Sequence, residues 1–378
     1  MKESFTHDVR AVLAAPGKGL SLKRIFAASW YLLLGYLAYL ILTYLALLYD
    51  GVSFDYIWQS YGPFPLRLFP FDALVAKAIH LLGISLAVIG MMLAILAPAL
   101  ITFEELRGNF FFSASSAIRL SFRRLATILL SLLSLAAFVG VVYFLGVVTG
   151  LAGRIPVLGG LVIGLLYIVP IFLTLVFTVF VVFVAIVGVV LLPVIVAGQK
   201  RGEVFDALLQ LFTVIIREPL RFTWYFLLST VLAKAASFVF AYLFYRAVQF
   251  SHLMLVHGGG ERVDRMFNGA LAMLPLNSPV VVFITTLWPG LRFGFTIERW
   301  GYGGDATPGA ILLAISFVLL FVVVCGYMTS VVATGLARGY AVIRRLKDDY
   351  MIVDESPLEP VDDYANPLFQ SEDHDPLK

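Results

Sequence analysis

The sequence predicts an all-α integral membrane protein: six transmembrane helices as three repeated helical hairpins, with interfacial amphipathic helices on the cytoplasmic side. Of its 378 residues, 61% are hydrophobic and only 13% are charged, and the mean hydropathy is +0.94. A soluble domain has roughly 25% charged residues, so lipid is the solvent that suits this composition. The apolar residues also gather in runs of about 20 or more, the length that crosses a bilayer.

Six apolar stretches form a membrane domain over residues 26–347, preceded by a polar cytoplasmic segment, 1–25. The predicted spans are 26–49, 75–103, 124–150, 155–198, 222–247 and 308–337. The fourth span is too long for one straight crossing, because an α-helix rises about 1.5 Å per residue. We expect either a helix kinked at Pro170 or a re-entrant segment before it. Residues 248–307 are predicted to form a long outer loop.

The distribution of basic residues predicts the orientation in the membrane. With six spans and the N-terminus inside, the cytoplasmic segments hold 18 of the 27 Lys and Arg residues, and the outer segments hold seven. Short cytoplasmic loops are the ones that collect Lys and Arg. Splitting 155–198 into two spans would put Arg201 and Arg221 on the opposite side from Arg123 and Arg124. We therefore expect both ends in the cytoplasm, and the bacterial cytoplasmic (inner) membrane as the location follows from the resemblance described below.

The C-terminal segment 348–378 differs from the rest in charge. It holds ten acidic residues and one basic residue, a net charge of −9, whereas the preceding residues have a net charge of +12. Acidic segments that are rich in proline and poor in apolar residues do not form a packed core. We expect a disordered cytoplasmic tail, either simply solvated or binding a basic protein partner.

A short motif recurs where the even-numbered spans reach the cytoplasm. The three copies are Arg107-Gly108, Arg201-Gly202 and Arg338-Gly339. A stretch of helical period follows each copy, and two of these stretches run into a basic segment that begins the next span. The pattern predicts a threefold repeat, each unit an amphipathic interfacial helix, a span, an outer turn and a returning span. Many membrane folds are built from such repeats, transporters among them, and so are simple scaffolds.

This pattern resembles a broad group of bacterial polytopic membrane proteins of poorly defined function. The resemblance covers roughly 98–245, through the Arg-Gly motif, the helix beginning at Ser113-Ala114 or Asp206-Ala207, and the basic-apolar segment that follows. The group includes the membrane domain attached to some glycerophosphodiester phosphodiesterases. Their catalytic domain has no counterpart in this sequence, so the resemblance implies a membrane fold but no activity.

One polar stripe crosses the predicted fifth span. Thr230, Lys234 and Ser237 are spaced i, i+4 and i+7, which places them on one face of a helix, and Tyr245 lies near the same face. A charged side chain near the bilayer centre costs on the order of 2.5–3.5 kcal/mol by insertion scales. Lys234 therefore either contacts a substrate or ion in a cavity, or is held by hydroxyl and carbonyl groups without a functional role.

No set of residues predicts catalysis. Glu104, Glu105 and Arg107 depart in spacing from the Glu-Glu-x-x-x-Arg motif of membrane-embedded prenyl-protein proteases, and we interpret them as a charge cluster at a helix end. Neither a nucleophile with its base nor a metal-binding set is found. We expect a non-enzymatic scaffold or accessory subunit of a membrane assembly, with the lipid bilayer as its environment, no cofactor and no nucleic-acid partner. The alternative is a transporter or channel with a polar pathway around Lys234.

Overall fold

The computed structural model describes residues 9–66, 69–156, 158–274, 282, 285–286, 288, 304, 307–348 and 355–358. Every element in these ranges is helical. The helices are α1 Val9–Leu13, α2 Ala15–Gly19, α3 Leu22–Tyr49, α4 Phe54–Tyr61, α5 Leu74–Leu106, α6 Ala114–Ala152, α7 Leu158–Leu166, α8 Phe172–Gly198, α9 Val204–Arg217, α10 Pro219–Ala272 and α12 Pro308–Asp348. In the described chain six of them, α3, α5, α6, α8, α10 and α12, are long and apolar enough to cross a membrane. The chain is therefore an all-α, multi-pass membrane protein, as the composition predicted.

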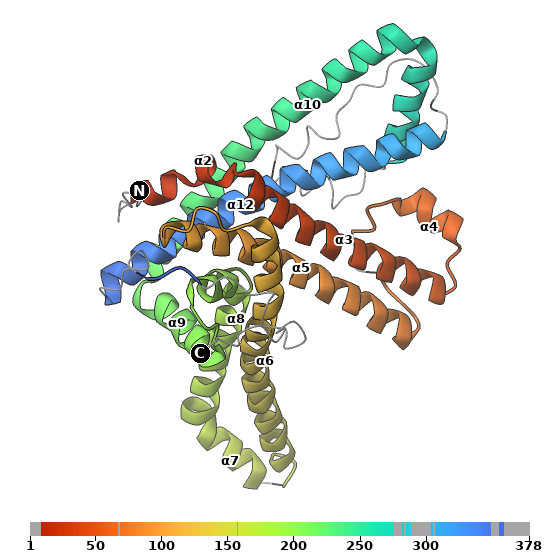
Figure 1. Ribbon diagram of the computed structural model, residues 1–378. Helices are drawn as coiled ribbons and strands as arrows, with labels where there is room; N and C mark the ends of the chain where they lie inside the picture. Colours follow the sequence, from red (N-terminus) through yellow and green to blue (C-terminus); the bar gives the residue numbers. More distant parts are fainter. Residues whose placement is uncertain are drawn as a thin grey trace, which may run out of the picture.

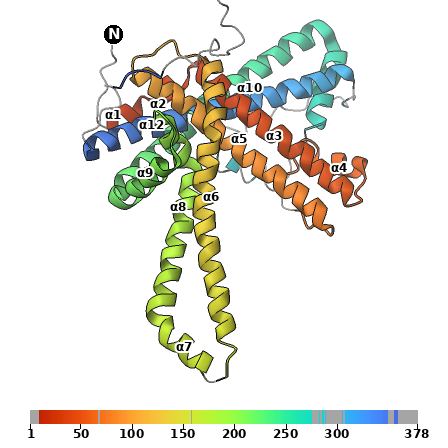
Figure 2. The same cartoon turned by 60° about the horizontal axis from the view of Figure 1, so that its bottom comes forward.

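The six long helices pair as three hairpins, α3 with α5, α6 with α8, and α10 with α12. The hairpins diverge from a common base, and their tips point in different directions (Figures 1 and 2). At the base, α5, α8 and α12 contact one another. We call this base the hub and define it as Met92–Glu104, Leu191–Gly198 and Ala333–Ile343, three stretches in which every residue is buried.

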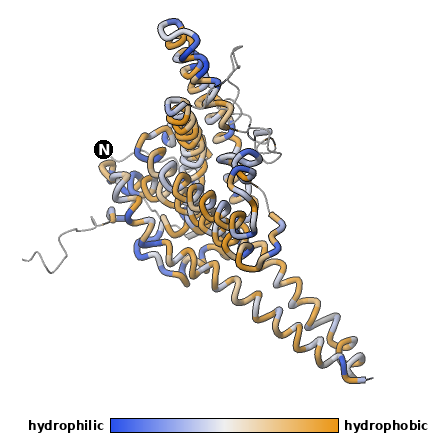
Figure 3. The backbone as a smooth tube through the Cα atoms, turned by 90° about the vertical axis from the view of Figure 1, so that its right-hand side faces the viewer, coloured by the Kyte–Doolittle hydropathy of each residue, from blue (hydrophilic) through white to orange (hydrophobic). Residues whose placement is uncertain are grey.

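The hub is the core of the molecule. Helices buried on all sides are apolar all round, and the hub stretches carry side chains such as Leu96, Leu100 and Ile195 with no exposed surface. Figure 3 shows that the hairpins are mainly hydrophobic between the hub and their tips. Hydrophilic residues gather at the hub end and at the tip of the α10–α12 hairpin. The short helices α1 and α2 contact α12 beside the hub. The first described residues and the end of α12 therefore lie at the same end of the molecule.

The fourth span is a kinked helix along its described length. A π-helical turn, Tyr167–Ile171, joins α7 to α8 and contains Pro170. Proline lacks the N–H group that a regular helical turn requires, and π-turns are a common site of kinks. Figure 2 shows α7 bent away from the line of α8 at the tip of its hairpin. The predicted kink at Pro170 is present, and both a kinked extension and a re-entrant segment remain predictions for residues 155–170.

Two other helices extend beyond the predicted spans. Helix α6 begins at Ala114, so the stretch expected to lie at the interface continues into the third span without a break. Helix α10 continues well past residue 247, into the predicted outer loop, and reverses at Gly260, whose φ is +59°. Glycine adopts positive φ without steric cost, which allows the reversal. Hydropathy marks the apolar core of a span, but helical hydrogen bonds continue as long as the following residues tolerate them.

The hairpin of α3 and α5 depends on two glycines. A Cβ atom added to Gly90 would lie 2.7 Å from the Cα of Gly35 and 2.9 Å from the backbone oxygen of Tyr31. These neighbours are backbone atoms and cannot rotate away, so the helices can cross this closely only without side chains. Small residues permit such close crossings of membrane helices.

We expect Gly90→Ala to lower the free energy of unfolding by about 1–3 kcal/mol, the usual cost of overpacking, even though alanine favours a helix over glycine by about 1 kcal/mol. The matched control is Gly140→Ala in α6, where an added Cβ would meet nothing within 4 Å. That variant should be neutral or slightly more stable. Unfolding of both variants in detergent micelles measures the difference, and equal effects would refute the close crossing.

Candidate functional site

The predicted polar stripe on α10 does not enclose a shared space. The Lys234 side chain is exposed, and within the described residues it makes no hydrogen bond or ion pair. Thr230 donates to the backbone oxygen of Phe226 at 2.8 Å, within its own helix. Ser237 is buried and accepts a hydrogen bond from Trp288 Nε1 at 2.6 Å. Ser237 also donates to the backbone oxygen of Lys234 at 3.3 Å, so the two residues are linked through the helix backbone and not through the exposed Lys234 side chain.

Tyr245, the last member of the stripe, bonds along its own helix. Its hydroxyl accepts a hydrogen bond from Gln249 Nε2 at 2.6 Å, and Gln249 also accepts one from Arg246 at 2.9 Å. These contacts satisfy the polar groups locally. The Tyr245 hydroxyl is therefore bonded to a residue further along α10.

The three Arg-Gly pairs occupy different environments. Gly108, with φ +93°, directly follows the C-cap of α5, which is the usual place of a positive-φ glycine after a helix. Gly202, with φ +69°, lies in the loop between α8 and α9, next to the N-cap of α9. Gly339 instead lies inside α12, packed against Tyr225. The side chains differ as well, because Arg107 and Arg338 are buried whereas Arg201 is exposed.

Arg107 is the centre of a buried ion network at the hub. Its guanidinium lies 3.0 Å from Glu104 Oε1 and 2.5 Å from Glu355 Oε2, and both the arginine and Glu104 side chains are fully buried. It also donates to the backbone oxygen of Gly198 at 2.7 Å. The network therefore joins the end of α5, the end of α8 and a segment that follows α12. Buried charges of this kind are tolerated because each is paired and hydrogen-bonded.

Glu355 belongs to a short segment, Glu355–Leu358, that we call the strap. The strap lies within the predicted acidic tail, and it is bonded to residues at and just beyond the ends of α5 and α8. Besides the Arg107–Glu355 pair, the backbone N–H of Leu358 donates to Glu104 Oε2 at 3.1 Å. Lys200 Nζ donates to Ser356 Oγ at 3.3 Å. The rest of 349–378 lies outside the described residues.

A second arginine, Arg124 of α6, holds the end of α8. Its guanidinium donates to the backbone oxygen of Val196 at 2.6 Å and to that of Lys200 at 3.0 Å. The last carbonyl groups of a helix have no partner within the helix, so a guanidinium at this end can donate to them. Its positive charge also interacts favourably with the negative end of the helix dipole. Arg124 is 5% exposed, so these bonds form away from bulk water. It ties the two helices of this hairpin together at the hub.

A third cluster connects α3 to α5. Glu105 accepts from Arg24 and lies 2.8 Å from Lys23 Nζ, and Lys23 also donates to the backbone oxygen of Phe110 at 3.1 Å. Glu104 thus pairs with Arg107 at the hub, whereas Glu105 pairs with Lys23 and Arg24 of α3. The sequence marked these residues as a charge cluster at a helix end, but it gave no sign that one of them is fully buried.

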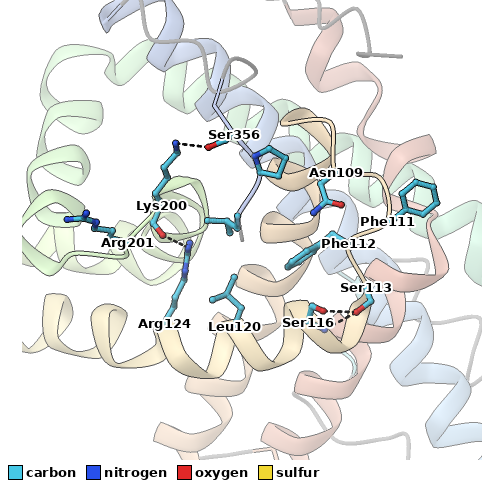
Figure 4. Close-up of a pocket in the computed structure, with 12 residues that line it drawn as sticks. Asn109, Phe111, Phe112, Ser113, Ser116, Leu120, Arg124, Lys200, Arg201 and Ser356 are labelled. Atoms are coloured by element: carbon cyan, nitrogen blue, oxygen red, sulfur yellow. Dashed lines mark hydrogen bonds between the residues drawn. The ribbon is translucent and has the colours of Figure 1, made fainter. Parts of the chain in front are cut away.

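Beside the network a pocket of about 920 Å³ opens between the α5–α6 loop, the start of α6, the α8–α9 loop and the strap. Figure 4 shows Lys200 and Arg124 on one side and Phe112 on the other, with Leu120 next to Arg124 on α6. Ser113 and Ser116 line it at the N-terminus of α6, where the Ser113 hydroxyl accepts from the Ser116 N–H at 3.1 Å. Arg201 lies at its edge. Within the described residues no three His, Cys, Asp or Glu side chains are placed to hold a metal ion.

Comparison with protein-family models, curated proteins and solved structures found no match. The expected resemblance to bacterial polytopic membrane proteins therefore stays a prediction. Sequence reasoning counted Arg124 only as a loop charge and Glu355 only as one acid of the tail. Nothing in the sequence distinguishes Glu355 from the neighbouring acids, because its role depends on the fold that places Arg107 within reach.

Proposed function

We propose that the protein is a non-enzymatic scaffold or accessory subunit of an assembly in the bacterial cytoplasmic membrane. The observation that carries this proposal is the uneven burial of the long helices. The most apolar window of α5 is 61% buried, whereas those of α6 and α10 are only 17% and 22% buried. Two hairpins therefore offer long apolar faces that the chain itself does not cover, which suit lipid and the helices of a partner protein.

Two features favour a scaffold over a transporter. The hub is filled by apolar side chains and closed ion pairs, and Lys234 is exposed on the outside of α10. A transporter would need a polar path between its helices, and intramembrane ionisable groups on such a path face the interior. The exposed Lys234 side chain is instead placed to extend along its helix towards a polar surface or to meet a partner.

The proposed orientation places the hub at the cytoplasmic side of the membrane. Basic residues such as Arg119, Arg123 and Arg217 lie near the hub ends of their helices, as expected for short cytoplasmic segments. Helix α9 buries Ala207, Leu211 and other residues of one side, which suits an interfacial helix. We include the threefold repeat in the proposal. The positive-φ glycines that follow α5 and α8 support it, whereas the third glycine of the motif, Gly339, lies inside α12.

Site-specific photo-cross-linking in cells tests the scaffold proposal. Benzoylphenylalanine in place of Phe144, a residue of α6 that is 66% exposed, should yield one discrete protein adduct. The control is the same substitution at Phe180 of α8, which is partly buried and packs near Phe212, and it should yield no intermolecular adduct. If Phe144 and matched positions on α10, such as Val239, capture only lipid, the faces serve the bilayer alone and the proposal is wrong.

A further inference from the structure

We propose that the pocket beside the strap binds the phosphate group of an anionic phospholipid headgroup. The pocket is lined by the basic residues Arg124, Lys200 and Arg201, and no acidic side chain is among its described lining residues. Such an excess of positive charge in a concave site attracts anions. The neighbouring acids do not offset it, because Glu104 and Glu355 both pair with Arg107.

The three cations have different roles in the site. Arg124 is held by backbone oxygens of α8 and the loop after it, so it supplies fixed positive charge. Lys200 and Arg201 are exposed, and Arg201 makes no hydrogen bond or ion pair among the described residues. Exposed Lys and Arg side chains reorient freely, so both can close on a phosphate. Lys200 Nζ now donates to the Ser356 hydroxyl at 3.3 Å. A phosphate oxygen would replace this hydroxyl as the acceptor, because a hydrogen bond between two charged groups is stronger.

The apolar part of the pocket favours a lipid over a soluble phosphate compound. Phe112, Leu120 and Leu358 line the pocket along with the polar residues, and such a mixed surface suits the phosphate and glycerol region of a phospholipid. Phe111, which is 97% exposed, stands at the same rim. An exposed Phe beside Lys and Arg residues is a common feature of segments that lie at the membrane–water interface. The hydroxyls of Ser113 and Ser116 add donors at the start of α6, where the helix dipole also favours an anion.

Lipid titration of the purified full chain in detergent micelles tests this site. Ligands that bind the folded state raise the melting temperature. Phosphatidylglycerol should raise the Tm of the wild-type protein, whereas phosphatidylcholine and inorganic phosphate should not. In the double variant Lys200→Gln with Arg201→Gln, the apparent Kd for phosphatidylglycerol should rise by about tenfold or more, since each lost bond is charge-assisted. Both residues are exposed, so the lipid-free Tm should stay near the wild-type value.

The matched control is Arg217→Gln, which removes an exposed arginine at the end of α9, outside the pocket lining. Its Kd for phosphatidylglycerol should stay within about twofold of wild type, as is usual for surface changes away from a site. Equal weakening in the control and the double variant would mean unspecific attraction and overturn the proposal. So would the absence of any Tm rise with phosphatidylglycerol. If inorganic phosphate alone raises Tm and needs Lys200 and Arg201, the ligand is a soluble phosphate and the lipid assignment is wrong. None of these outcomes depends on the cross-linking at Phe144.

Discussion

Arg107→Met is expected to destabilise the protein by about 3–5 kcal/mol, the usual loss when one partner of a buried ion pair is removed. The methionine fills a similar volume but leaves the carboxylates of Glu104 and Glu355 without their cation. It also removes the hydrogen bond to the backbone oxygen of Gly198. Equilibrium unfolding of the detergent-solubilised protein, followed by circular dichroism, measures the change.

Two further variants test this explanation of the Arg107 effect. The triple variant Arg107→Met, Glu104→Gln, Glu355→Gln carries no unpaired charge at the hub and should recover part of the lost stability, because neutral groups cost less to bury. Arg217→Met removes an exposed arginine and should change the free energy of unfolding by less than about 0.5 kcal/mol. A triple variant no more stable than Arg107→Met would show that the carboxylates are not the source of the loss.

Arg124→Met is expected to cost about 2–3 kcal/mol, since buried acceptors that lose a partner carry their full desolvation penalty. The backbone oxygen of Val196 would lose its donor where α8 ends, and the loop at Lys200 would lose its anchor. Unlike the Arg107 effect, this loss should be local. Hydrogen–deuterium exchange should therefore speed up most at the end of α8 and in the α8–α9 loop.

The control for Arg124 is its neighbour in the sequence. Arg123 is exposed on the same helix, and Arg123→Met should leave both stability and exchange close to wild type. Uniformly faster exchange over all six long helices in Arg124→Met would contradict a local anchoring role. It would indicate instead that Arg124 determines the stability of the whole hub.

The six long helices could be predicted from the sequence because the bilayer imposes a length and an apolar composition on each span. The ends of the helices could not. Hydropathy falls at residue 247, yet α10 continues to Gly260, where only the backbone freedom of glycine allows the chain to reverse. Similarly, the helix expected to begin at Ser113-Ala114 does not end before the third span but continues through it as α6. These ends depend on local hydrogen bonding, which hydropathy does not report.

The site was harder to predict because its residues come from distant parts of the chain. Helical spacing put Lys234 and Ser237 on one face, but a face defined by spacing is broad enough to include one exposed and one buried residue. Arg201 was selected as part of a repeated motif, and the structure places it at a pocket edge. Lys200 and Ser356, which meet at that pocket, are 156 residues apart, and periodicity within one helix cannot relate such positions.

The strap has a consequence for the order of synthesis. Arg107 enters the membrane region with the first hairpin, but one of its two carboxylate partners, Glu355, lies 248 residues later in the chain. Until the ribosome has released nearly the whole polypeptide, Glu104 is the carboxylate that pairs with Arg107, and the contact between Arg107 and the strap is missing. A chain cut short after the sixth helix would keep that unfinished state.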